Sequence, residues 1–181
     1  GLELGMTAGG HHTHLLVEHN PAAMHVLRRR FPDTKLEGDV RDLVALPGNT
    51  DVIVAGFPCQ DLSSVGRKVG IDGARSSLVG EVFRLAIRSD VPWLVLENVP
   101  FLMSLAQGAA LTLITTTLTD LGYRWAYRVV DSNAFGLPQR RNRWYLVASR
   151  DGDPRDVLLA DDAEKPVPAV DYPDVACGFY W

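Results

Sequence analysis

Residues 52–64 read Val-Ile-Val-Ala-Gly-Phe-Pro-Cys-Gln-Asp-Leu-Ser-Ser. The apolar run at the start predicts a buried strand, because a short apolar segment bounded by turn formers is typical of one. Gly56 and Pro58 end that strand, and Cys59 lies just beyond its end. Ligands bind to open α/β sheets at the edge formed by the carboxyl ends of the strands. Cys59 is therefore either a packed small side chain or a nucleophile at that edge.

Predicted strands and helices alternate on both sides of this stretch. Short apolar segments predict strands at 14–18, 35–39, 93–96, 124–130 and 144–149, and periodicity or a favourable first turn predicts helices at 2–6, 21–30, 77–89 and 102–121. This alternation predicts an α/β fold with a doubly wound, Rossmann-like sheet that ends in a β-hairpin. Right-handed crossovers between its parallel strands leave few possible topologies.

The composition is that of an ordinary globular protein. Of its 181 residues, 46% are hydrophobic and 22% charged, and the formal net charge is −4. Such a chain is too apolar to be disordered. Because its net charge is negative, it would bind nucleic acid only through a local basic face. It has no apolar run of about 20 residues and no signal-peptide pattern, so we expect a cytoplasmic protein without a membrane partner. Cys59 and Cys177 are far apart and are expected to stay reduced.

Two carboxylates follow predicted strands near the N-terminus. Glu18 ends one strand, where a carboxylate accepts hydrogen bonds from ribose hydroxyls in nucleotide-binding sheets. A solvated carboxylate beside a turn is an equally good interpretation of its position. Asp39 is placed to accept from an adenine amino group, and equally well placed to cap the turn that follows it. Both alternatives stay open for both residues.

Cys59 and Glu97 each stand at the end of a predicted strand. The residues after Cys59 are mostly polar, unlike the apolar surroundings of a structural cysteine. No histidine is near it in sequence, so its thiol would need activation by the electrostatic surroundings. Glu97 would face the same pocket if the two strands are neighbours about 4.8 Å apart. The simpler role for Glu97 is to cap the next turn.

Gln139–Arg143 is a basic turn that leads into the last predicted strand. Most such runs are solvated loops. Arg141 and Arg143 are two residues apart, however, so on a strand they point to the same side. Such a pair suits a bidentate clamp on a phosphate or a carboxylate. All five histidines lie between residues 11 and 25 with no cysteine nearby, and we expect no metal site.

Taken together, these motifs resemble those of the bacterial DNA (cytosine-5)-methyltransferase family, in family order along almost the whole chain. Each motif is weak alone, but five or more in order are specific. The segments that carry the resemblance are Gly1–Gly5, similar to the tail of the family's glycine-rich first motif, then Val17–Asn20, Gly38–Val40, Gly56–Gln60 with Ser63, Ser77–Leu78, Glu97–Val99 and Gln139–Arg143.

The resemblance implies transfer of a methyl group from S-adenosylmethionine, leaving S-adenosylhomocysteine, to carbon 5 of a cytosine flipped out of duplex DNA. It implies that Cys59 adds to carbon 6, that Glu97 contacts the ring nitrogen and exocyclic amine, and that Arg141 assists at the carbonyl oxygen. Loop 62–75 would close over the base. The other residues it assigns are Glu18, His19, Asp39, Val40, Pro58 and Leu78 for the cofactor, and Gln60, Ser63, Asn98, Gln139 and Arg143 for the substrate.

The resemblance also suggests a domain organisation. Residues 1–150 would form the catalytic, S-adenosylmethionine-binding domain, and residues 151–181 a linker toward a target-recognition domain. Gly1 and Trp181 both look like cuts, so we expect the natural protein to extend further at both ends. That protein would be monomeric, cytoplasmic and associated with the bacterial nucleoid through DNA, as the modification part of a restriction-modification system.

Two alternatives remain within this interpretation. A tRNA cytosine methyltransferase has the same fold, although Phe57 before Pro58 favours DNA over the second proline typical of those relatives. A non-catalytic or split subunit would depend on a second chain. The intact Cys59, Glu97 and Arg141 argue against a loss of catalysis.

Overall fold

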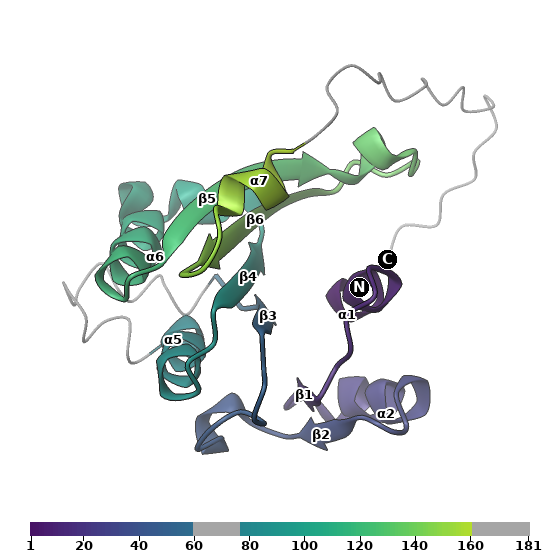
Figure 1. The fold of residues 1–181 in the computed structure, drawn as a ribbon. Helices are drawn as coiled ribbons and strands as arrows, with labels where there is room; N and C mark the ends of the chain where they lie inside the picture. Colours follow the sequence, from purple (N-terminus) through teal and green to yellow (C-terminus); the bar gives the residue numbers. More distant parts are fainter. Residues whose placement is uncertain (60–76, 161–181) are drawn as a thin grey trace.

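The computed structural model describes residues 1–59 and 77–160 (Figure 1). Two residues expected to bind substrate, Gln60 and Ser63, lie outside the described residues, as does the predicted loop 62–75. The elements are α1 (Leu2–Ala8), β1 (Leu15–Val17), α2 (Pro21–Arg30), β2 (Lys35–Glu37), β3 (Val52–Gly56), α5 (Leu78–Arg88), β4 (Trp93–Asn98), α6 (Ala109–Asp120), β5 (Arg124–Asp131), β6 (Asn142–Ser149) and α7 (Pro154–Leu158), with 3₁₀ turns at Val40–Asp42, Pro100–Met103, Leu105–Gly108 and Ser132–Phe135.

The described strands form two sheets. β1 and β2 pair in parallel, and the second sheet has the order β3-β4-β6-β5. In the second sheet β3 and β4 are parallel, whereas β6 runs antiparallel to both β4 and β5. This arrangement confirms the α/β class and the predicted hairpin. It also brings β3 and β4 side by side, as the shared pocket of Cys59 and Glu97 requires.

Most of the core lies on one face of the four-stranded sheet. Alternate residues of β4 and β6 point to that face, and α5 and α6 cover it. Ser77 caps the amino end of α5, because its hydroxyl accepts a hydrogen bond from the backbone N–H of Gly80. α7 packs on the opposite face of the hairpin, where Arg128 donates to the Leu158 carbonyl. The largest fully buried side chains of this core are Trp144, Leu94, Leu96, Leu102, Ile114, Leu118 and Leu146.

The predicted helix at 102–121 is wrong in its first third. Two 3₁₀ turns occupy residues 100–108, and α6 begins only at Ala109. Ala106 and Gln107 adopt left-handed backbone conformations with φ of 51° and 56°. These angles break the helix, and Gly108 with φ 88° starts the next one. The buried Leu102 anchors the turns to the core, so apolar periodicity continues through a segment that is not a helix.

The folded unit extends past residue 150, where the sequence predicts a linker. Asp153 caps α7 by accepting from the backbone N–H of Arg155, and Pro154 is buried against the sheet. The remainder of the predicted linker, 161–181, lies outside the described residues. Among the helices of residues 1–59 and 77–160, none has the length and apolar character needed to cross a bilayer.

Candidate active site

The ends of β3 and β4 form one side of an open pocket. In the parallel register of these strands Gly56 is opposite Glu97, so the turn after β3 and the end of β4 meet at one edge. Cys59 lies in that turn and is partly exposed. The pocket has a volume of about 400 Å³ and is lined by Phe57, Pro58, Cys59, Glu97, Asn98, Val99, Arg141 and Arg143. The structure thus brings together residues that are more than 80 positions apart in the sequence.

An ion pair joins Glu97 to Arg143 across the pocket. The Nε atom of Arg143 lies 2.8 Å from Oε1 of Glu97, and the two side chains are 22% and 21% exposed. The antiparallel direction of β6 explains this contact, because the amino end of β6 lies beside the carboxyl end of β4. Arg143 donates a further hydrogen bond from Nη1 to the Asn142 carbonyl. The guanidinium is therefore fixed beside the carboxylate at the mouth of the pocket.

Gly56 gives the Glu97 carboxylate room. A Cβ atom added at Gly56 would lie 3.1 Å from Oε2 of Glu97. That distance is shorter than an ordinary van der Waals contact, so a larger residue would displace the carboxylate. Gly56 has no positive φ, and the close approach of the neighbouring carboxylate accounts for the glycine here.

The two arginines of the basic turn have different partners. Arg141 lines the pocket, and its backbone N–H donates to Oδ1 of Asp131 at 3.3 Å. Arg143, not Arg141, makes the ion pair with Glu97. Gln139, expected to bind substrate, is exposed on the hairpin, where its carbonyl accepts from the Ser132 hydroxyl at 2.6 Å. Within the described chain, Gln139 therefore supports the turn and does not line the pocket.

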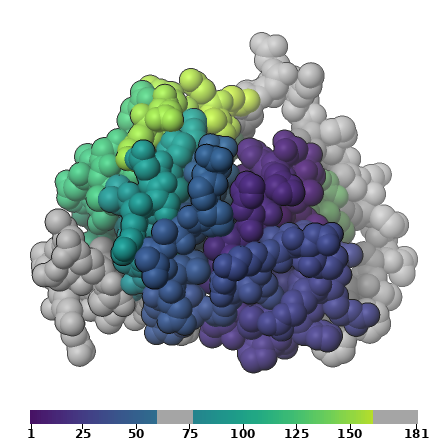
Figure 2. Space-filling model, turned by 60° about the horizontal axis from the view of Figure 1, so that its bottom comes forward, coloured from purple at the N-terminus to yellow at the C-terminus, as the bar shows by residue number. Residues whose placement is uncertain are grey.

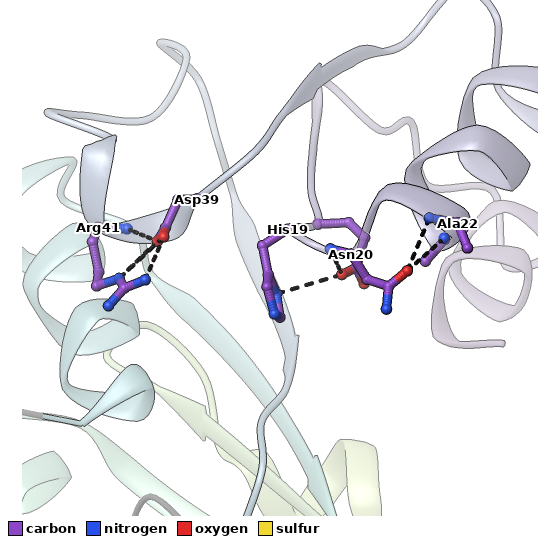
Figure 3. A network of polar contacts seen from close by, with 7 residues as sticks. His19, Asn20, Ala22, Asp39 and Arg41 are labelled. Atoms are coloured by element: carbon purple, nitrogen blue, oxygen red, sulfur yellow. Dashed lines mark hydrogen bonds and ion pairs between the residues drawn. The ribbon is translucent and has the colours of Figure 1, made fainter.

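Glu18 and Asp39 follow the two strands of the small sheet. Because β1 and β2 are parallel and Val17 pairs with Glu37, both carboxylates lie at the same strand edge. Glu18 accepts the backbone N–H of Asn20 at 2.8 Å, and His19 lies 3.6 Å from the same oxygen, Oε1. Asn20 in turn caps α2 (Figure 3). Both of these contacts are made by Oε1, and no hydrogen bond joins Oε2 to another of residues 1–59 and 77–160.

Arg41 binds the carboxylate of Asp39 in a bidentate pair. Its Nε and Nη2 atoms lie 3.0 and 2.6 Å from Oδ1 and Oδ2 of Asp39 (Figure 3). The backbone N–H of Arg41 also donates to Oδ1, so Asp39 caps the turn at Val40–Asp42. These hydrogen bonds hold the pKa of Asp39 at about 2. The capping role expected as the alternative for Asp39 is thus present.

The other residues expected near the cofactor come from four separate segments of the chain. His19 is largely exposed beside Glu18, and the Val40 carbonyl accepts from Nη2 of Arg84 in α5 at 3.3 Å. Leu78 is the first residue of α5, and Pro58 lines the Cys59 pocket. In residues 1–59 and 77–160 no three His, Cys, Asp or Glu side chains come close enough together to hold a metal ion.

Sequence reasoning missed Arg41 and the close approach at Gly56. The signal for Arg41 is the pattern Asp-x-Arg, which recurs at Asp153-Pro154-Arg155 with the same hydrogen bonds. No signal in the sequence gives the contact of Gly56, because it depends on the register of β3 against β4.

Comparison with known proteins decides the family. Residues 1–175 match the C-5 cytosine-specific DNA methylase family. The chain belongs to this family. Among curated members, the chain is 44% identical over 189 residues to the type II methyltransferase M2.BsuMI of Bacillus subtilis (strain 168), covering 100% of this chain and 48% of that protein. It is 31% identical to M.AquIA of Picosynechococcus, covering 84% and 68%. The chain thus spans about half the length of M2.BsuMI.

Solved structures show the same fold for this C-5 cytosine methylase chain. A mutant of DNMT2 from Spodoptera frugiperda superimposes with a TM-score of 0.66 at 19% identity, over 83% of this chain and 47% of the other. A prophage-encoded DNA modification methyltransferase of Escherichia coli gives a TM-score of 0.63 at 20% identity, over 82% and 43%. At such low identity the likeness concerns the Rossmann-like fold.

Proposed function

We propose that the protein to which this chain belongs transfers a methyl group from S-adenosylmethionine to carbon 5 of cytosine in duplex DNA. The observation that carries the proposal is the pocket in which Cys59, Glu97 and Arg143 meet. A thiol, a carboxylate and a guanidinium at one strand edge suit covalent chemistry on a polar heterocycle. Membership of the C-5 cytosine methylase family gives that chemistry its substrate.

The edge of the small sheet fits the methyl donor. Glu18 offers Oε2 to ribose hydroxyls, and Asp39 offers a charged carboxylate to an adenine amino group. His19, Val40, Pro58 and Leu78 are proposed to line the same cofactor site. When bound, S-adenosylmethionine supplies an electrophilic methyl group. The chain's own residues orient it and act on the base.

Cys59 is the proposed nucleophile. Cytosine is poorly nucleophilic at carbon 5, but addition of the Cys59 thiolate to carbon 6 makes carbon 5 enamine-like, so that it can accept the methyl group. Glu97 contacts the ring nitrogen and the exocyclic amine and so stabilises the adduct. Loss of the carbon-5 proton and elimination of the thiolate then release 5-methylcytosine. The base must leave the DNA stack to reach these groups.

Arg143 is proposed to assist Glu97 more directly than Arg141 does. Its guanidinium already contacts the carboxylate, and the carbonyl oxygen of a base bound to Glu97 would lie within reach of further N–H donors of the same fork. Arg141 is exposed at the mouth of the pocket, where it suits a DNA phosphate. This proposal assigns to Arg143 the role expected for Arg141.

A methyl-transfer assay with the full-length protein tests the function. Labelled S-adenosylmethionine is offered with cytosine-containing duplex DNA, and in parallel with tRNA. We expect label in the DNA and none in the tRNA. We expect Cys59→Ser to abolish the transfer, and DNA containing 5-fluorocytosine to trap a covalent adduct with the unaltered protein. Full activity of Cys59→Ser would contradict the mechanism, and label confined to tRNA would contradict the substrate.

A matched pair of variants separates the two arginines. Arg143→Ala is expected to lower kcat at least tenfold, because it leaves Glu97 without its partner. Arg141→Ala is expected to weaken DNA binding with a smaller effect on kcat, and its effect should diminish in high salt. Equal kcat values for the two variants would argue against the different roles.

The protein is further proposed to act in the cytoplasm as the modification part of a restriction-modification system, in line with the type II names of its curated relatives. The full-length protein is proposed to be a monomer. Sedimentation of the full-length protein, alone and with DNA, tests this state, and an activity that appears only with a second chain would instead indicate a split enzyme.

A further inference from the structure

Asn98 is the last residue of β4 and is only 4% exposed. Because side chains alternate along a strand, it points to the opposite face from Glu97, toward the core. A buried amide group is costly unless its donors and acceptors are satisfied. Asn98 was expected to bind substrate, so its partners matter.

Both ends of the Asn98 amide are bound within the chain. Its Nδ2 atom donates to the carbonyl of Phe57 at 2.8 Å, and its Oδ1 atom accepts from the backbone N–H of Val99 at 2.8 Å. The second hydrogen bond fixes the orientation of the amide plane. The first therefore points at the turn after β3 with little freedom.

This contact continues the sheet by one step. The backbone ladder between β3 and β4 ends at the pair Gly56 and Glu97. Phe57 lies beyond the ladder, and Pro58 has no N–H with which to anchor the turn. The side chain of Asn98 therefore takes the place of the next ladder bond. It ties the carbonyl two residues before Cys59 to the residue next to Glu97.

We propose that Asn98 is a positioning residue, which sets the Cys59 thiol relative to Glu97 through its hydrogen bond to Phe57. Its amide is not used to bind the base. The role of Asn98 in catalysis rests on the function proposed above. Its effect on the position of the Cys59 thiol does not depend on that function. A misplacement of about 1 Å is enough to slow a well-oriented reaction about a hundredfold.

The test compares Asn98→Leu with Leu118→Ala in the full-length protein. Leucine has the same number and branching of heavy atoms as asparagine but removes both hydrogen bonds. Leu118 is fully buried in α6, so its truncation lowers stability without touching the turn. We expect Asn98→Leu to slow adduct formation with saturating 5-fluorocytosine DNA by roughly ten- to hundredfold, with DNA affinity within about twofold of the unaltered protein. Leu118→Ala should lower the Tm at least as much and leave the adduct rate within about twofold.

Alkylation of Cys59 by iodoacetamide, followed by peptide mapping to distinguish it from Cys177, gives a readout that needs no DNA. We expect Asn98→Leu to change its rate by about threefold or more. If the unaltered protein forms no adduct, the proposed function fails, and the alkylation rates alone decide the positioning role. If Asn98→Leu matches the unaltered protein in alkylation, and in adduct formation where that occurs, Asn98 does not position Cys59.

Discussion

No residue from Gly1 to Gly56 is buried, whereas α5, β4, α6 and β6 bury most of their apolar side chains. The two regions form adjoining blocks on one face of the molecule (Figure 2). Apart from β3, which pairs with β4, the first is held largely by local contacts, such as the Asn20 cap and the Asp39–Arg41 pair. The second is held by a continuous core. Segments with few buried contacts open at low free energy, so the region that carries Glu18 and Asp39 is expected to be the less stable one.

The two regions are expected to differ most in how much stability they lose when an apolar side chain is truncated. Leu146→Ala in β6 removes a fully buried side chain and is expected to lower the free energy of unfolding by roughly 2–5 kcal/mol. Val26→Ala in α2 removes a side chain that is 57% exposed and should change it by less than about 0.5 kcal/mol. Urea unfolding of the two variants measures both values, and similar losses would remove the contrast.

Substitution of a glycine by alanine should show the same contrast in stability between the two regions, with smaller changes. A Cβ atom at Gly152 would lie 2.5 Å from Cζ2 of Trp93, whereas nothing lies within 4 Å of one at Gly48. Gly152→Ala is therefore expected to cost about 1–3 kcal/mol. Gly48→Ala should be neutral or slightly stabilising, because alanine restricts the unfolded chain. Thermal unfolding distinguishes them, and a stable Gly152→Ala variant would show that Trp93 can move aside.

Gly56 lies at the boundary, and its substitution should affect activity more than stability. Gly56→Ala moves the Glu97 carboxylate by a few tenths of an ångström. We expect adduct formation to slow by roughly tenfold, with a stability change below about 1 kcal/mol. Rates with 5-fluorocytosine DNA and urea unfolding check the two quantities. Gly48→Ala is the control, and an unchanged rate for Gly56→Ala would mean that Glu97 tolerates the shift.

The smallest expected effect is a change in the pKa of one carboxyl group in each region. It should be equal in both regions, because each carboxyl group is bound by an arginine only two residues away. Arg41 and Arg155 hold the pKa values of Asp39 and Asp153 at about 2. A lowered pKa means that each carboxylate stabilises the fold above about pH 4 and loses this effect as the pH falls toward 2. Arg41→Ala and Arg155→Ala should raise the two pKa values toward 3.8, the ordinary value. NMR titration of the carboxyl carbons measures them, and unequal shifts would show that the surrounding region matters.

The positions of β3 and β4 along the chain were predictable from the sequence. Short apolar runs ended by Gly56 and by Glu97-Asn98 place β3 and β4 correctly. Whether these two strands are neighbours was left open by the sequence, and the parallel register of β3 and β4 answers it. The break before α6 was not predictable, because Ala106 and Gln107 are good helix formers that here adopt left-handed angles. Tertiary packing of Leu102 overrides that propensity.

The sequence predicts several residues that line the pocket, among them Cys59, Glu97 and Arg141, but it does not predict their contacts. Arg141 and Arg143 lie two residues apart at the entry to β6, so the sequence alone does not say which one meets Glu97. The register of β6 against β4 decides it. Asn98 likewise has a side chain of the kind that binds ligands. Only the position of the Phe57 carbonyl shows that its amide group already donates a hydrogen bond within the chain.

The strand order β3-β4-β6-β5 has a consequence for synthesis on the ribosome. β5 is made before β6 but pairs only with β6 among the described strands, so it cannot join the sheet in the order in which it emerges. Until Arg143 and the rest of β6 leave the ribosome, the nascent chain carries an open β4 edge and an uncompensated Glu97. Such an edge is prone to wrong pairing. The pocket is thus completed late, and in one step, when the hairpin closes against β4.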